Sequence, residues 1–417
     1  MNRREFLGIL AAGATGGILA ESAAAAQGTA GGEIRVGMSA AFRGAAGLGT
    51  ELYRGAQAYY SEINARGGVF GRPISVVALD DSYNPEPCIR NTIQLLDREK
   101  VFFLSNYVGT PTLTRALPVI KQYADQHVVL VGNFTGAQPQ REPPYVDQVF
   151  NVRASYRQEM QALVERFWQT GARRFGVYYQ IDAYGRSGTD GVARALAARN
   201  ARIVAEATYV RNATFDEDMG IAVTALREAG CDVVLCTGAY QGCAAFVRSA
   251  RDAGFTVPIS NVSFVGSDAM LALLVKHGRT KGRDYTRGLI NSQVVPSYDD
   301  AVLPGVAEYR ALMDKHNPSV PEAIRDANYV PQKYSFISLE GYVNARVITE
   351  ALKRAGANAG RPAFRQALES LRGLDLGIGA PVTFTPERHQ GLDSVYFTRV
   401  EGDRWVPIVD WSAAVKV

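Results

Sequence analysis

Short apolar runs rich in β-branched residues alternate with longer amphipathic segments along most of this chain, and this rhythm constrains the fold more than any other feature. Residues 34–38 have the composition of a buried strand, residues 48–65 carry apolar side chains at helical spacing, and residues 74–79 form the next apolar run. A strand, a helix and a second strand in this order form a parallel pair with a right-handed crossover. The rhythm predicts an α/β fold of parallel sheets with helices on both faces.

The rhythm stops at a proline-rich loop over residues 138–144 and begins again with a helix predicted for residues 157–169. About 390 residues follow the first 26, which is more than one core usually holds. We therefore expect two similar lobes that share a cleft at the carboxyl ends of their strands, where parallel sheets bind ligands. The later predicted strands are 175–179, 203–209, 233–236, 259–265 and 289–295, with helices at 185–199, 216–229, 242–253, 302–316, 334–355 and 362–371.

The corner that follows residues 101–104 is the most informative local feature. This apolar run leads through small and polar residues to Gly109, Thr110 and Pro111, where a helix is predicted to begin. Thr110 suits the N-cap because its hydroxyl can accept a free backbone N–H, and Pro111 suits the first helical position. The free amides and the helix dipole predict that a carboxylate can dock at Gly109 and Thr110 without a basic side chain.

The first residues have the pattern of an export signal. Arg3 and Arg4 precede an apolar stretch rich in alanine and glycine, and Ala24 and Ala26 offer a small-residue cleavage site. The pattern resembles a twin-arginine signal over residues 1–26, so we expect a periplasmic protein. Because no cysteine lies near the cleavage site, we do not expect a lipoprotein.

The composition argues against several classes of function. A formal charge of +4 without a Lys/Arg cluster does not favour nucleic acid or an anionic membrane as partner. The four histidines stand outside any HExxH pattern, and the chain lacks a GxSxG elbow and a P-loop. The glycine turn at residues 44–49 fails the GxGxxG spacing of a dinucleotide site. We therefore expect no enzyme, no bound metal and no cofactor.

Four cysteines, Cys88, Cys231, Cys236 and Cys243, could oxidise in an exported protein. Cys231 and Cys236 flank a predicted strand, which places them roughly 16 Å apart and beyond disulfide reach. A bond between Cys236 and Cys243 is conceivable, but small buried core residues are the favoured interpretation.

Several motifs in a fixed order resemble the type I periplasmic binding proteins of the leucine/isoleucine/valine class. The most specific is EINARGGVFGR at residues 62–72; the others are Asp80–Asp81, the turn at 107–111, DAYG at 182–185 and SLEGY at 338–342. The resemblance covers nearly the whole mature chain. It implies two Rossmann-like lobes joined by three crossovers, with hinge closure around a small ligand.

This resemblance implies crossings near residues 150, 296 and 378. The first lobe would then comprise residues 33–150 and 296–378, and the second lobe residues 151–295 and 379–417. The implied partners are an inner-membrane ABC permease and its ATPase, and we expect a monomer. A related alternative is a periplasmic sensor that hands a ligand signal to a membrane receptor, because the fold alone does not separate transport from sensing.

In the first lobe, Gly109 and Thr110 match the turn that holds the ligand carboxylate in amino-acid binders, and Phe134 and Thr135 match a second pair of contacts. Thr110 could equally serve only as a helix cap. Arg43 stands in the first loop where the family usually has serine. It is either a solvated loop residue or a bidentate partner for a carboxylate.

In the second lobe, Tyr184 and Tyr240 match aromatic contacts, and Asp268 matches the acid that holds an α-ammonium. Asp268 could instead be an acid at the start of a helix. Tyr156 beside the first crossover is either hinge packing or a ligand contact. Since Phe134 replaces a small residue, an aromatic or lipophilic carboxylate is as compatible with the sequence as an amino acid.

Overall fold

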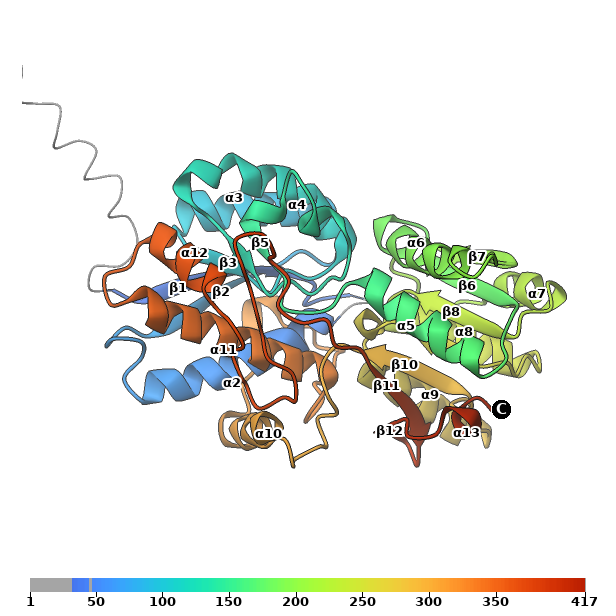
Figure 1. Ribbon diagram of the computed structural model, residues 1–417. Helices are drawn as coiled ribbons and strands as arrows, with labels where there is room; N and C mark the ends of the chain where they lie inside the picture. Colours follow the sequence, from blue (N-terminus) through green and yellow to red (C-terminus); the bar gives the residue numbers. More distant parts are fainter. Residues whose placement is uncertain (1–31, 45–46, 417) are drawn as a thin grey trace, which may run out of the picture.

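The computed structural model describes residues 32–44 and 47–416, which form two lobes lying side by side, each around its own sheet (Figure 1). The predicted signal at residues 1–26 lies outside the described residues. The first sheet is parallel throughout, in the order β2-β1-β3-β4-β5. Its strands are β1 (Ile34–Ala40), β2 (Ile74–Asp80), β3 (Phe103–Ser105), β4 (Leu130–Val131) and β5 (Val149–Phe150).

The second sheet has the order β12-β11-β10-β9-β8-β6-β7. Five of its strands are parallel, and the last two of the chain add to the edge in antiparallel fashion. The strands are β6 (Phe175–Gln180), β7 (Ala205–Tyr209), β8 (Val233–Thr237), β9 (Ile259–Asn261), β10 (Leu289–Gln293), β11 (Tyr396–Glu401) and β12 (Arg404–Pro407). The α/β class predicted from the sequence is confirmed.

Helices cover both sheets. Around the first sheet lie α2 (Leu48–Ala65), α3 (Pro85–Ile93), α4 (Thr110–Gln122), α10 (Pro304–His316), α11 (Phe336–Ala355) and α12 (Arg361–Glu369) (Figure 1). Around the second lie α5 (Tyr156–Gln169), α6 (Ala183–Ala197), α7 (Gly220–Glu228), α8 (Tyr240–Asp252), α9 (Ser267–Lys281) and α13 (Trp411–Ala414). In residues 32–44 and 47–416, no helix has the length and apolar character needed to cross a membrane.

The chain passes between the lobes after β5, after β10 and before β11 (Figure 1). The first and third connections run side by side, because the Gly391 amide donates to the Asn151 carbonyl at 2.8 Å. The third connection also packs on the first sheet, where the His389 ring stacks on Phe150 at 3.9 Å between centroids. These three segments are the covalent links between the lobes in the described residues.

Apart from shifts of a few residues at the ends of elements, the main differences from the sequence prediction lie just after β9. The strand predicted for residues 259–265 ends at Asn261, because Ser263–Val265 forms a short turn of 3₁₀ helix that leads to Gly266. Helix α9 was not predicted at all. It starts directly after this turn, so Asp268 lies in the first turn of a helix.

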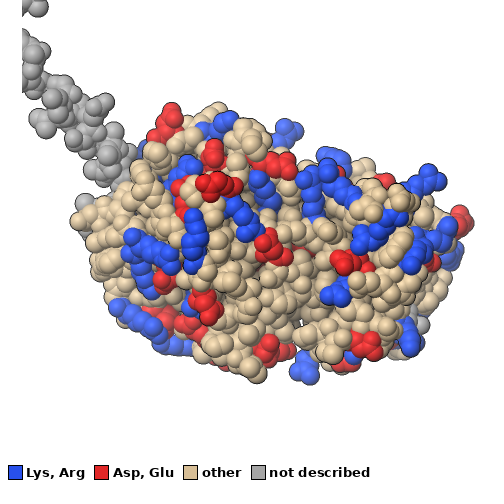
Figure 2. Space-filling model, viewed as in Figure 1, with Lys and Arg blue, Asp and Glu red and all other residues tan. Residues whose placement is uncertain are grey.

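All four cysteines are buried with free thiols. On the face drawn in Figure 2, Lys and Arg side chains are interspersed with Asp and Glu over both lobes. This distribution agrees with the small net charge of the sequence.

Candidate ligand-binding site

The corner after β3 is built around Gly109. Its φ of +102° lies in the left-handed region, and a β-carbon there would overlap the ring of Tyr83. Its amide donates to the Phe134 carbonyl at 3.1 Å. Gly109 is the N-cap of α4, so the expectation that Thr110 caps this helix is wrong. The Thr110 hydroxyl pairs with the hydroxyl of Thr135 and makes no cap hydrogen bond to α4.

Thr110 and Thr135 bring the two predicted first-lobe turns together. Their hydroxyl oxygens lie 2.6 Å apart, and both side chains are buried. An isolated bridge between Val108 and Phe134 extends the pairing of β3 and β4 into the two turns. Two hydroxyls and the adjacent helix start therefore stand at the carboxyl ends of neighbouring strands, where a carboxylate oxygen can be bound.

Five aromatic side chains from both lobes meet next to these hydroxyls. We call them the ring cluster; they are Tyr83, Phe134, Tyr156, Tyr184 and Phe264. Phe264 lies at the centre, with its ring centroid 4.6 Å from Tyr184, 5.0 Å from Phe134, 6.1 Å from Tyr83 and 6.5 Å from Tyr156. All five are buried. Because Phe134 and Phe264 stack across the lobes, the cluster is formed only when the lobes are together.

Tyr156 and Tyr184 are positioned by the helices that they begin. Asp182 caps α6 by accepting from the Tyr184 amide at 2.9 Å, and the Tyr184 hydroxyl donates to the Gly238 carbonyl at 3.4 Å. Tyr156 is the first residue of α5, and its hydroxyl is buried beside Thr135 without a hydrogen bond of normal geometry. Burial raises the pKa of Tyr156 to about 12, so its O–H remains a donor.

Asp268 joins the two lobes. Its carboxylate accepts from the Tyr298 hydroxyl at 2.8 Å and from the Phe336 amide at the start of α11 at 3.1 Å. Burial raises the pKa of Asp268 to about 7. Because both oxygens already have partners within the protein, this acid is less suited to hold a ligand ammonium than the sequence suggested.

Tyr240 and Arg43 lie apart from the ring cluster. Tyr240 begins α8, is nearly buried beside Gly266, and accepts from the Gln241 amide at 3.3 Å. Arg43 is exposed, and its guanidinium donates to the Ala323 carbonyl. Of the two interpretations of Arg43, the structure supports the solvated loop residue tied to its own lobe.

The sequence prediction missed a buried group of charges beside the cluster. Arg153 follows β5, and its Nη2 lies 3.4 Å from Glu159 on α5 and donates to Ser263. Its Nη1 lies 3.6 Å from Glu340 on α11. The signal available in the sequence was an arginine within the apolar segment 149–154, which is an unusual place for a charge.

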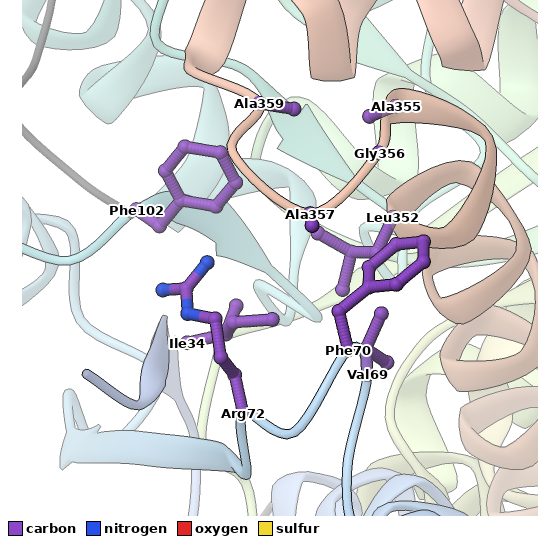
Figure 3. Close-up of a pocket in the computed structure, with 10 residues that line it drawn as sticks. All are labelled: Ile34, Val69, Phe70, Arg72, Phe102, Leu352, Ala355, Gly356, Ala357 and Ala359. Carbon is purple, nitrogen blue, oxygen red and sulfur yellow. The ribbon is translucent and has the colours of Figure 1, made fainter. Parts of the chain in front are cut away.

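A small cavity of about 10 Å³ lies at the opposite edge of the first lobe (Figure 3). It is lined by Ile34 at the start of β1, Phe102 just before β3, and the segment after α11. These are the amino ends of the strands, away from the edge where parallel sheets bind ligands. In the part of the chain that the structure describes, no group of His, Cys, Asp and Glu could hold a metal ion.

Comparison with known proteins agrees with this architecture. A possible leucine/isoleucine/valine-binding protein from Rhodopirellula baltica superposes with a TM-score of 0.80 at 30% identity, over 94% of this chain and 99% of its own. A branched-chain amino acid ABC transporter protein from Thermus thermophilus with bound valine has the same fold, with a TM-score of 0.78 at 18% identity over 92% and 96% of the chains.

Among curated proteins, an amino acid binding protein from Pseudomonas aeruginosa is 24% identical over 330 residues, which cover 78% of this chain and 80% of the relative. The model of the periplasmic binding protein family matches residues 33–404. The match spans the first sheet, the second sheet up to the first residue of β12, the three connections and every residue of the ring cluster. The chain is therefore a member of the periplasmic binding protein family.

Proposed function

We propose that this protein is the substrate-binding component of an ABC importer and traps a small ligand between its lobes. The observation that carries the proposal is the ring cluster, in which side chains of both lobes enclose Phe264 beside the paired hydroxyls of Thr110 and Thr135. A ligand that contacts both lobes favours the closed state by its differential affinity. No covalent step is needed, and we do not propose an enzyme.

The proposed moving bodies are the lobes expected from the sequence, residues 33–150 with 296–378 and residues 151–295 with 379–417, except that Phe384 and His389 would move with the first lobe because their rings pack on Phe150. The three connections would act as the hinge. The pairing of the first and third connections at Asn151 and Gln390 supports a common axis, because two adjacent strands bend together.

The proposed ligand is an amino acid or another small carboxylate. Its carboxylate would lie at Gly109, Thr110 and Thr135, as the helix start and the paired hydroxyls favour. The remaining body would lie against the aromatic side chains Phe134, Tyr156 and Tyr184. Tyr240 and Asp268 would line the second-lobe side of the interface, and Arg43 would remain at the rim.

We propose a periplasmic location, reached through the twin-arginine-type signal at residues 1–26, without a lipid anchor. The closed monomer would present its surface to an inner-membrane permease with its ATPase. The interspersed charges of Figure 2 are compatible with a reversible protein contact and do not favour nucleic acid.

A thermal-shift screen of residues 27–417 tests the proposal. The panel contains amino acids, aliphatic and aromatic carboxylates, and the corresponding amides. A ligand present at 100 times its dissociation constant adds about 2.7 kcal/mol to the free energy of unfolding, which raises the melting temperature clearly. We expect at least one amino acid or carboxylate to do so.

A pair of tyrosine variants then locates the ligand. Tyr184→Ala removes a ring of the cluster and should weaken binding by at least about tenfold, because a buried aromatic side chain contributes more than about 1.4 kcal/mol. Tyr179→Ala is the matched control, since Tyr179 bonds to Glu206 on the outer side of the same lobe. Equal affinities for the two variants, or no ligand in the whole panel, would contradict the proposal.

A further inference from the structure

The guanidinium of Arg153 is buried with part of its hydrogen-bonding capacity unused. The residue is 1% exposed, and only its Nη2 donates, to Ser263 and Glu159. The Nε and Nη1 groups have no hydrogen-bond partner. A buried donor without an acceptor is costly, and arginine offers donors only. The missing partner must therefore be an acceptor such as a carboxylate oxygen.

These free donors stand at the edge of the ring cluster. The guanidinium carbon lies 4.8 Å from the ring centroid of Phe134 and 5.8 Å from that of Tyr156. The Tyr156 hydroxyl, another buried donor without a well-formed bond, lies beside Thr135. Buried donors of two different residues thus lie next to flat apolar faces, which is the arrangement that an acid with an aromatic body requires.

The two nearby acids do not use all the hydrogen-bond donors of Arg153. Glu159 is engaged within the second lobe, where it accepts from the Ser263 amide at 2.8 Å and the Ser292 hydroxyl at 2.6 Å. Glu340 makes no hydrogen bond within the described residues and stays 3.6 Å from Nη1. It faces Arg153, Glu159 and Arg141, and burial raises its pKa to about 7. At neutral pH Glu340 can therefore take up a proton and leave Arg153 to an incoming anion.

A ligand ammonium has no comparable place. Asp268, where the sequence predicted one, already accepts from the Tyr298 hydroxyl with one oxygen and from the Phe336 amide with the other. The ring cluster itself consists of aromatic rings and hydroxyls, and Glu340, the nearby acid that makes no hydrogen bond within the described residues, already faces Arg153 at 3.6 Å. The local chemistry therefore favours an anion over a zwitterion.

We propose that the ligand is a small aromatic carboxylate, one oxygen of which stays at the turn of Gly109 and Thr110. Arg153 determines this specificity by donating from Nε and Nη1 to the other carboxylate oxygen, while the ligand ring lies against Phe134 and Phe264. The inference rests on the proposed function and adds the ligand class and a specificity residue. Arg153 is enclosed when the lobes are together, so the ligand reaches it from the open state.

Calorimetric titration of the wild-type protein is the first arm of the test. The probes are benzoate, phenylacetate and 3-phenylpropanoate, with their primary amides, phenylalanine and valine. We expect at least one aromatic acid to bind at least about tenfold more tightly than its amide and than either amino acid. Tight binding of valine or phenylalanine with no aromatic acid would overturn this inference while supporting the proposed function. Binding of no probe would overturn both.

The second arm uses Arg153→Gln, which should remove the preference of acid over amide and weaken acid binding at least about tenfold. Arg157→Gln is the matched control, because Arg157 bonds to Asp190 and Glu142 at the surface and its loss changes the net charge equally. An unchanged acid preference in Arg153→Gln would overturn the inference.

If Arg153→Gln does not fold, Glu340→Gln tests the role of Arg153 in a protein that retains this arginine. This variant removes the carboxylate that competes for the guanidinium. We expect the wild type to bind the acid more weakly at pH 8 than at pH 6, because Glu340 ionises in this range and competes for Arg153. Glu340→Gln should bind the acid equally tightly at both pH values. A pH profile identical to that of the wild type would contradict the role of Arg153.

Discussion

Asp268 is a single residue whose protonation is coupled to folding. Burial raises its pKa from the usual 3.8 to about 7 in the folded protein. Between about pH 4 and pH 7 the folded state keeps a proton that the unfolded state has released, so the free energy of unfolding falls as pH rises through this window. Asp268→Asn removes this contribution. We expect a flatter dependence of stability on pH, measured by urea unfolding at pH 5 and pH 8.

The control for this measurement is Asp300→Asn, since Asp300 is an exposed acid in the same connection as Tyr298. Its pH profile should match that of the wild type. Buried Asp81 and Glu340, whose pKa values are also raised to about 7, keep part of the slope in both variants. A profile for Asp268→Asn as steep as that of the wild type would show that Asp268 is not buried as described.

Gly109→Ala tests the corner at the start of α4. The added methyl group meets the Tyr83 ring and forces an alanine into a backbone conformation with φ of +102°. We expect a loss of about 2–4 kcal/mol in the free energy of unfolding. Gly67→Ala isolates the backbone part of this cost, because Gly67 has φ of +98° with open space around it. Equal losses for the two variants would exclude the contact with Tyr83.

The sequence placed candidate site residues close together where a local signal existed. Gly109, Thr110 and Thr135 follow short strands in turns, and the structure brings them together. Phe264 and Arg153 could not be found in this way. Phe264 belongs to an apolar run like any other core segment, and the burial of Arg153 depends on Glu159 and Glu340, which lie on separate helices.

Helix α5, the first helix of the second lobe, begins with a capping box. The Ser155 hydroxyl accepts from the Gln158 amide at 3.3 Å, and the Gln158 side chain accepts from the Ser155 amide at 2.8 Å. Ser155→Ala should lower the free energy of unfolding by about 1 kcal/mol. Thermal unfolding checks this value. Ser187→Ala on α6 is the comparison, because that hydroxyl makes no hydrogen bond within the described residues, and its change should be smaller.

Element prediction depended on how clearly the pattern changes at each boundary. The parallel strands and most helices appear near their predicted positions because apolar runs and turn residues mark their ends. Helix α9 was missed because the apolar run before it continues past the end of β9, so that one turn of 3₁₀ helix reads as strand. The buried face of α9 also consists largely of small residues and methionine, which give a weak helical signal.

At the scale of the whole molecule, the sequence predicts two sheets but not how the lobes meet. Contacts such as Phe134 with Phe264, Asp268 with Phe336, and Arg153 with Glu340 join segments that are far apart in the chain. Local periodicity contains no information about such pairs. The ligand specificity that we propose therefore depends on how the lobes contact each other, and these contacts can be identified only in the folded structure.

Phe264→Ala tests whether Phe264 holds the two lobes together or stabilises the core of a single lobe. The ring packs on Phe134 from the first lobe and on Tyr184 from the second, so its loss removes contacts that hold the lobes together. Truncation of a buried phenylalanine costs about 3–5 kcal/mol when all its neighbours belong to one unit. Here the lobes can separate and admit water instead. We expect the radius of gyration without ligand, measured by small-angle X-ray scattering, to rise, while the melting temperature falls less than for a core phenylalanine.

Phe103→Ala supplies that comparison, because Phe103 is equally buried and stacks on Phe364 at 4.7 Å within the first lobe. Its loss leaves a cavity that no lobe movement can relieve, so it should lower the melting temperature without expanding the molecule. The two variants remove the same side chain, and only the origin of the neighbouring rings differs. If both unfold alike and neither expands, Phe264 belongs to a fixed core and closure around it does not occur. If only Phe264→Ala expands, the ring cluster is the contact that a ligand must re-form to close the trap.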